Sequence, residues 1–81
     1  MEVPQIDPQG PVPPYQQIAD WLRQQIIAGD LRPGQVIPSE KDLVDLFGVA
    51  RTTARRTVAL LREEGLVRTV PQRGTYVTSP E

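Results

Sequence analysis

The chain has 81 residues, of which 38% are hydrophobic and 23% charged, with a net charge of −1 and no cysteine or histidine. This length suits one small domain with a single core. The lack of cysteine and histidine excludes disulfides and the usual zinc sites, and no nucleophile is paired with a base, so we expect no metal, cofactor or enzyme activity. No apolar run approaches the ~20 residues of a membrane span, and the start lacks the pattern of a signal peptide, so we expect a cytoplasmic protein.

Charge is divided unevenly along the chain. Residues 1–50 contain three basic and seven acidic residues, whereas residues 51–81 contain six arginines and three glutamates. The first part therefore has a net charge of −4 and the second a net charge of +3. Contacts with phosphates depend on the local footprint rather than on total charge, so the second part is the candidate surface for an anionic partner.

Residues 1–13 are expected to form a flexible arm, because five prolines fall within residues 1–14. Arms that enter a minor groove use Arg or Lys, whereas this one carries only Glu2 and Asp7 as charged side chains, so we favour a loose terminus. Helical spacing then predicts a helix over 14–28 that ends at Gly29. Trp21 lies at the edge of its apolar stripe, where packing is favoured over base stacking.

The middle of the chain carries turn and cap signals. Pro33-Gly34 fits the centre of a type II turn, and residues 35–37 can form at most a short third strand before the next proline. Ser39 is placed to cap a helix over 40–47, with Asp42 at the capping-box position. The expected buried stripe of this helix is Leu43, Leu46 and Phe47.

A third helix is expected over 51–64, with Ala54, Val58 and Leu61 on its buried face. Its acids, Glu63 and Glu64, lie at its far end, where they oppose the helix dipole but stay clear of a phosphate backbone that approaches the start. Strands over 66–70 and 75–78 then predict a hairpin, and residues 79–81 a frayed end.

The second and third helices, joined by a short turn that contains Gly48, fit the helix-turn-helix pattern. A recognition helix enters the major groove by its N-terminal end, where Arg51 and Arg55 can offer forks to guanine or phosphate. Thr52 and Thr53 are short hydrogen-bonding groups beside them, and Arg56 adds a third guanidinium. The alternative is that these arginines form an ordinary solvated face. Arg73, beside Gly74 at the hairpin tip, could reach a minor groove or a phosphate, although both are also common turn residues.

Several blocks in register resemble the winged helix-turn-helix domain of the GntR family, over about Tyr15 to Val77. The blocks are Tyr15-Gln16-Gln17-Ile18-Ala19, Gly29-Asp30-Leu31-Arg32-Pro33-Gly34, Ile37-Pro38-Ser39-Glu40, Phe47-Gly48-Val49-Ala50-Arg51-Thr52-Thr53, Glu64-Gly65-Leu66-Val67 and Arg73-Gly74-Thr75-Tyr76-Val77. The resemblance implies a bacterial transcription regulator, usually a repressor, that binds a palindromic operator as a dimer. It also implies that Arg51, Arg55 and Thr53 contact DNA, that Lys41 does so from the second helix, and that Gly74 is the wing glycine.

Two departures from the family pattern bear on the site. Ala50 stands where Ser or Thr usually caps the third helix, so its first turn is expected to fray and to become fully ordered only on DNA. Gln72 stands where a first wing glycine is common, which leaves the path of the wing open. The effector-binding and dimerising domain of the family is not present in these 81 residues. We therefore favour a fragment of a longer regulator over the alternative, a stand-alone domain, and we expect weak binding to DNA as a monomer.

These observations predict an α+β winged helix-turn-helix fold with three helices, a C-terminal two-stranded hairpin and room for a short third strand near 35–37. The expected domains are the arm 1–13, the DNA-binding domain 14–78 and the end 79–81. The partner is double-stranded operator DNA; the alternative is a winged helix that docks on an acidic protein. The expected DNA-binding residues are Ser39, Lys41, Arg51, Thr52, Thr53, Arg55, Arg56, Arg73 and Gly74.

Overall fold

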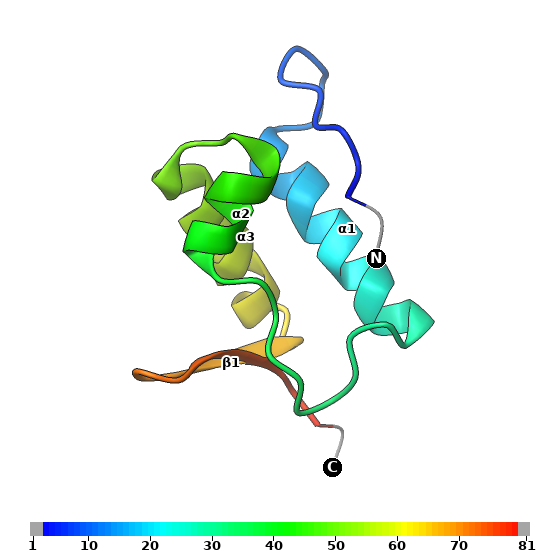
Figure 1. Ribbon diagram of the computed structural model, residues 1–81. Helices are drawn as coiled ribbons and strands as arrows, with labels where there is room; N and C mark the ends of the chain where they lie inside the picture. The colour runs from blue at the N-terminus through cyan, green and yellow to red at the C-terminus, as the bar shows by residue number, and fades with distance from the viewer. Residues whose placement is uncertain (1–2, 80–81) are drawn as a thin grey trace.

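The structure, a computed structural model, describes residues 3–79. Its elements in chain order are α1 (Pro14–Ala28), α2 (Glu40–Phe47), α3 (Arg51–Glu63), β1 (Val67–Val70) and β2 (Gly74–Val77). Figure 1 shows the helices packed together above the hairpin, with the start of α3 and the hairpin tip on the same side of the molecule and α1 on the opposite side. The predicted fold class, a winged helix-turn-helix with three helices and a C-terminal hairpin, is confirmed.

The helix ends follow from local sequence. Gly29 has φ 88° and its N–H donates to the carbonyls of Gln25 and Ile26, which closes α1 at the predicted residue. Gly48 has φ 66° and closes α2 in the same way, through the carbonyl of Val44. The third helix ends at Glu63, one residue before the predicted end.

The hairpin is antiparallel, with Val67 opposite Val77 and Val70 opposite Gly74. The strands are four residues each and begin one residue away from the predicted positions, because Gly74 pairs with Val70 instead of belonging to the turn. The turn is closed by the Arg73 N–H, which donates to the Val70 carbonyl at 3.0 Å. Gln72 sits at its third position with φ 64°, so the wing keeps the left-handed backbone that glycine would favour there.

A single bridge adds the segment before α2 to the edge of β2. Val36 pairs with Tyr76, the Ile37 N–H donates to Thr75 at 2.8 Å, and the Val77 N–H donates to Gln35 at 2.8 Å. The preceding turn has Gly34 at φ 85°, as the type II pattern predicts. These bonds tie the start of α2 to the wing.

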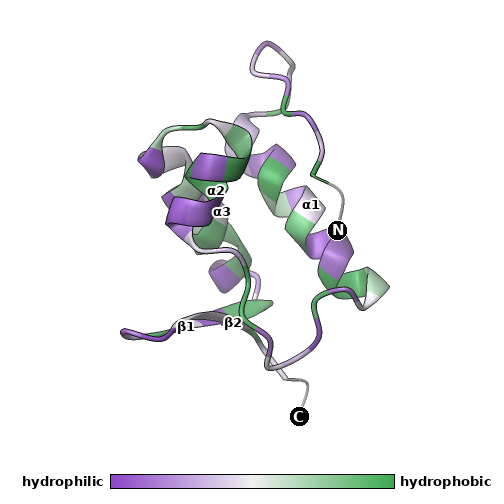
Figure 2. Ribbon diagram, viewed as in Figure 1, coloured by the Kyte–Doolittle hydropathy of each residue, from purple (hydrophilic) through white to green (hydrophobic). Residues whose placement is uncertain are grey.

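The core lies between α1, α3, α2 and the hairpin, and includes Ile18, Leu22, Leu43, Leu61 and Val67, each at most 2% exposed. Trp21 packs edge-on against Phe47 with ring centroids 5.4 Å apart, which confirms its packing role. The predicted stripe of α2 is partly wrong, because Leu46 is 47% exposed. An eight-residue helix that packs through one face buries only the residues on that face, and Leu46 lies outside it. Figure 2 shows hydrophilic residues on the outward turns of α2 and α3.

The described part of the arm lies against the helices. Gln17 accepts from the Asp7 N–H at 3.0 Å and donates to the carbonyls of Asp7 and Val12 at 2.8 and 2.7 Å. Ile6 is half-buried and packs against the core. The flexibility of the arm and the domain limits stay predictions, and residues 1–2 and 80–81 lie outside the described part of the chain. No helix within residues 3–79 is long and apolar enough to cross a membrane.

Candidate nucleic-acid interface

The start of α2 is built by a complete capping box. The Asp42 N–H donates to Ser39 Oγ at 3.0 Å, and the Ser39 N–H donates back to Asp42 Oδ2 at 3.0 Å. The Ser39 backbone bond, followed by the Ser39 side chain, lowers the pKa of the Asp42 carboxyl. The box therefore fixes the first turn of α2, which positions Glu40 and Lys41 beside α3.

The start of α3 is less constrained. Ala50 has the extended backbone of an N-cap, but its side chain accepts no hydrogen bond from the helix. Thr53 is half-buried and its N–H donates to the Ala50 carbonyl at 3.0 Å, whereas Thr52 is exposed. The first turn of α3 thus presents polar groups and free amides to solvent, which suits contact with phosphate oxygens.

Glu40 lies between the two arginines that the sequence singled out. Its Oε1 is 3.9 Å from Nε of Arg51 and 3.9 Å from Nε of Arg55. The arginine side chains are 68% and 64% exposed, so these ion pairs are weak and the guanidinium groups stay available to a ligand. One carboxylate between two cations leaves a net positive charge and directs both arginines to the same side of α3.

Sequence reasoning missed the role of Glu40. The sequence pattern gives Glu40 a place in the Ile37-Pro38-Ser39-Glu40 block but no function. The signal that could have indicated this role is the position of Glu40, one residue after the Ser39 cap and at the start of α2, the helix that precedes α3. In a helix-turn-helix that position lies next to the start of the second helix, but only the packing angle of the two helices decides the distance.

Lys41 is exposed and pairs within its own helix. Its Nζ lies 3.0 Å from Asp45 Oδ2, and this hydrogen bond raises the pKa of Lys41. The side chain is 77% exposed, so the pair can open at little cost when a phosphate approaches.

The wing tip completes the surface. A hollow of about 360 Å³ lies between α2, α3 and the hairpin, and five of the predicted residues line it: Ser39, Lys41, Arg51, Arg73 and Gly74. Gly74 has φ 134°, a backbone conformation that disfavours any other residue, and a Cβ there would come within 3.1 Å of Val36 Cγ2, so the Val36 side chain would also have to shift. The other four predicted residues lie along α3 outside this hollow.

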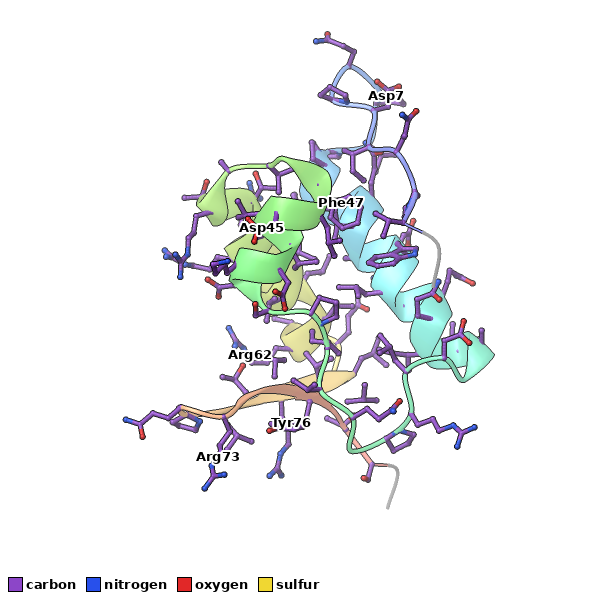
Figure 3. All side chains as sticks on the ribbon, in the orientation of Figure 1. Asp7, Asp45, Phe47, Arg62, Arg73 and Tyr76 are labelled. Atoms are coloured by element: carbon purple, nitrogen blue, oxygen red, sulfur yellow. The ribbon has the colours of Figure 1, made fainter. Side chains whose placement is uncertain are left out.

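Arg62 couples the wing to α3. Its guanidinium donates to Thr69 Oγ1 at 2.7 Å, and Thr69 is hydrogen-bonded across the hairpin to Thr75 at 3.2 Å. Figure 3 shows Arg62 between α3 and the hairpin, with Arg73 and Tyr76 on the far side of the strands. Arg62 therefore links the hairpin to α3 through a hydrogen bond and does not lie free on the outward face of the helix.

One of the two acids at the end of α3, Glu64, has a structural explanation. Glu64 binds the Arg23 guanidinium of α1 through two hydrogen bonds of 2.9 and 2.8 Å, and Asp20 contacts the same guanidinium. The unfavourable dipole position of Glu64 is therefore offset by an ion pair with α1. Its placement is not by itself evidence for DNA binding, which corrects that part of the sequence argument.

The fold and these side chains define a winged helix-turn-helix domain of the DNA-binding type. The chain belongs to the GntR family: residues 14–77 match the family described as bacterial regulatory proteins, gntR family. The family consists of transcription regulators, which confirms the expectation of a regulator rather than an enzyme.

Curated relatives and a solved complex agree with this assignment. The chain is 40% identical over 76 residues to the HTH-type transcriptional repressor NagR of Bacillus subtilis (strain 168), covering 94% of this chain and 31% of NagR. It is 43% identical over 68 residues to the mannosyl-D-glycerate transport/metabolism system repressor MngR of Escherichia coli (strain K12), covering 84% of this chain and 28% of MngR. The chain thus spans less than a third of the length of these relatives.

Among solved structures, the chain is similar to AraR(DBD) in complex with operator ORX1. The TM-score is 0.84 and the identity 32%, over 96% of this chain and 100% of the other. A relative with this fold has therefore been seen on an operator.

Proposed function

We propose that this chain is the DNA-binding domain of a cytoplasmic bacterial repressor and that it reads one half-site of a double-stranded operator. In this proposal α3 enters the major groove and the hairpin acts as a wing. Support comes from the family, from relatives named as repressors, and from the operator complex of AraR(DBD).

The observation that carries the proposal is the convergence of three segments on one side of the molecule. The start of α2, the start of α3 and the wing tip border a single hollow whose lining includes Lys41, Arg51 and Arg73, with the Arg73 side chain extending to the other side of the hairpin (Figure 3). These residues are far apart in sequence, and all three carry positive charge. A duplex that meets this side can be contacted by all three segments together.

The residues take different parts in this proposal. Arg51 and Arg55 reach base edges or phosphates, because a guanidinium fork matches guanine O6 and N7 as well as a phosphate. Thr52 and Thr53 contact a phosphate or a thymine methyl group at the helix start. Ser39 and Lys41 contact the backbone from α2, and Arg73 does so from the wing, with Gly74 permitting its close approach.

The assembly is part of the proposal. Where a dimerising domain accompanies this chain in a longer regulator, that regulator binds a palindromic operator as a dimer, whereas this chain alone binds as a monomer. A monomer makes half of the phosphate contacts of a dimer, so we expect weak, salt-sensitive binding with a smaller salt slope than that of a dimer.

The test begins with selection of bound sites from random duplexes, followed by titration of the selected half-site and a scrambled duplex of equal length. Arg51→Ala or Arg55→Ala should cost ~1–3 kcal/mol on the selected site if the side chain reads a base. Equal loss on both duplexes would assign that arginine to phosphate. Arg32→Ala is the matched control, because Arg32 is an exposed arginine of the segment after α1 and lies outside α2, α3 and the hairpin. Figure 1 shows this segment on the side of the molecule opposite the start of α3 and the hairpin tip.

The same titration decides between the two functions. Absence of binding to any duplex at low salt would refute the proposal and favour the alternative, a winged helix that docks on an acidic protein. Sedimentation of the chain with and without the selected half-site measures the expected monomer.

A further inference from the structure

An aromatic ring at the start of α1 supports one of the arginines of α3. The Arg56 guanidinium carbon lies 4.2 Å from the centroid of the Tyr15 ring, which is a cation–π contact. Tyr15 is half-buried and Arg56 is exposed. The Tyr15 hydroxyl accepts a hydrogen bond from the Gln16 amide at 3.1 Å. The ring is therefore partly enclosed by the protein, while the guanidinium that stacks on it remains accessible.

A buried threonine holds this pair together. Thr57 is fully buried, and its hydroxyl lies 2.9 Å from the Thr53 carbonyl and 3.3 Å from the Tyr15 carbonyl. The second contact crosses from α3 to the first turn of α1. Because Thr57 follows Arg56 directly, the link fixes the backbone of both members of the stack relative to each other.

The neighbouring arginines of α3 are turned to different flanks. Successive residues of an α-helix differ by about 100° around the axis, so Arg55 and Arg56 cannot share a direction. Arg55 faces α2, where it approaches Glu40, whereas Arg56 faces α1, where it stacks on Tyr15. On one flank of α3 the Arg55 guanidinium thus lies near the Glu40 carboxylate, and on the other the Arg56 guanidinium stacks on the Tyr15 ring.

The flank position of Arg56 indicates what it would contact. A helix with its side chains is ~10–12 Å across and the major groove is ~12 Å wide, so side chains on the flanks of an inserted helix face the phosphate walls. Within residues 3–79, no carboxylate forms an ion pair with Arg56, in contrast to Arg51 and Arg55. Stacking occupies the face of the guanidinium and leaves its N–H groups at the edge free to bind a phosphate.

We propose that Tyr15 is a positioning residue that holds Arg56 for a sequence-independent contact with the phosphate backbone, on the groove wall nearest the start of α1. The inference rests on the proposed function, and it assigns to Tyr15 a part in DNA binding. The contact adds affinity on any duplex and does not read a base.

The first test measures affinity for the selected half-site and for a scrambled duplex across a range of salt. Arg56→Ala should weaken both by the same factor and reduce the salt slope by about one. Tyr15→Leu should weaken both by about two- to fivefold, the range of an exposed cation–π contact. Tyr15→Phe keeps the ring and should bind like the unmodified chain. Arg32→Ala serves again as the control for loss of one positive charge.

The second test is a double-mutant cycle. If Tyr15 acts through Arg56, Tyr15→Leu should cause no further loss in a chain that already carries Arg56→Ala. In the free protein, the Arg56 side-chain protons should show a ring-current shift that Tyr15→Phe retains and Tyr15→Leu removes. This shift and the Arg56→Ala titration remain decisive if Tyr15→Leu fails to fold, which thermal unfolding of each variant reveals.

Several results would overturn the inference. Loss on the selected site alone for Arg56→Ala would make it a base-reading residue, and equal losses for Tyr15→Phe and Tyr15→Leu would make the hydroxyl itself the contact. An undiminished Tyr15→Leu effect in the Arg56→Ala background would show that the two residues act independently. If the unmodified chain binds DNA, and Arg56→Ala and Tyr15→Leu bind it as tightly as the unmodified chain does, the inference alone is overturned. If the unmodified chain binds no duplex, the proposed function and the inference are overturned together.

Discussion

Glu40 is expected to weaken the nonspecific binding of the chain to DNA. Its carboxylate is 3.9 Å from Nε of both Arg51 and Arg55. Two unit charges at this distance attract by about 1 kcal/mol in water, and measured exposed pairs contribute ~0.2–1 kcal/mol each. A phosphate must compete with this carboxylate for both guanidinium groups. Glu40→Gln should therefore strengthen binding to a scrambled duplex by roughly two- to tenfold.

The selected half-site should gain less from Glu40→Gln than the scrambled duplex does, because the same carboxylate orients the two forks toward their targets. The ratio of specific to nonspecific affinity should therefore fall, which fluorescence anisotropy titrations on the two duplexes measure. Glu63→Gln is the matched control, since it removes one exposed carboxylate of the same type at the other end of α3. Thermal unfolding should show a loss of ~0.3–1 kcal/mol in the free energy of unfolding for Glu40→Gln, because the Glu40 carboxylate also interacts favourably with the positive end of the α2 dipole.

Two outcomes would refute this reasoning. A gain of the same size from Glu63→Gln would show that net charge, rather than the position of Glu40, sets nonspecific affinity. Weaker binding of Glu40→Gln to the selected site alone would show that the carboxylate contacts a base directly, for example by accepting from the cytosine amino group.

Three further predictions concern stability. Ala50→Ser should add an N-cap and raise the free energy of unfolding by ~1 kcal/mol in urea titrations, with slower amide exchange over 51–53. If exchange there is equally slow in the unmodified chain with and without operator, the expected ordering on DNA is wrong. Leu43→Ala, at a side chain 0% exposed, should cost ~2–5 kcal/mol, whereas Leu46→Ala, at one 47% exposed, should cost less than ~1 kcal/mol. The pKa of Asp42 is lowered in the fold, so its contribution should be complete above about pH 4 and be lost as pH falls through the lowered value. Thermal unfolding against pH should show this loss in the unmodified chain and not in Asp42→Asn.

Much of the fold follows from local signals. The ends of α1 and α2 were predicted to the residue because Gly29 and Gly48 adopt the left-handed backbone that closes a helix. The capping box of Ser39 and Asp42 was likewise readable, since both partners lie within one turn. These features depend on residues at most four positions apart, so no knowledge of the tertiary structure was needed.

The errors arose where distant segments decide the outcome. Leu46 was expected in the core because its spacing was apolar and helical, but the packing of α2 leaves it 47% exposed. Glu64 was interpreted through the helix dipole alone, whereas its partner Arg23 lies 41 positions away in the sequence. The assignment of Gly74 to the turn is a different, local error, because Val70, with which its backbone pairs, is only four positions away.

The candidate site divides in the same way. The sequence by itself determined that α3 begins with arginines and threonines, that a hairpin with an arginine at its tip follows, and in what order these elements occur, because composition and periodicity are local properties. Only the tertiary structure decided that Glu40 lies between Arg51 and Arg55, that Arg56 stacks on Tyr15, and that the wing tip borders the same hollow as α2. Those contacts depend on the angles at which the helices and the hairpin pack, and such angles are set by the whole core at once.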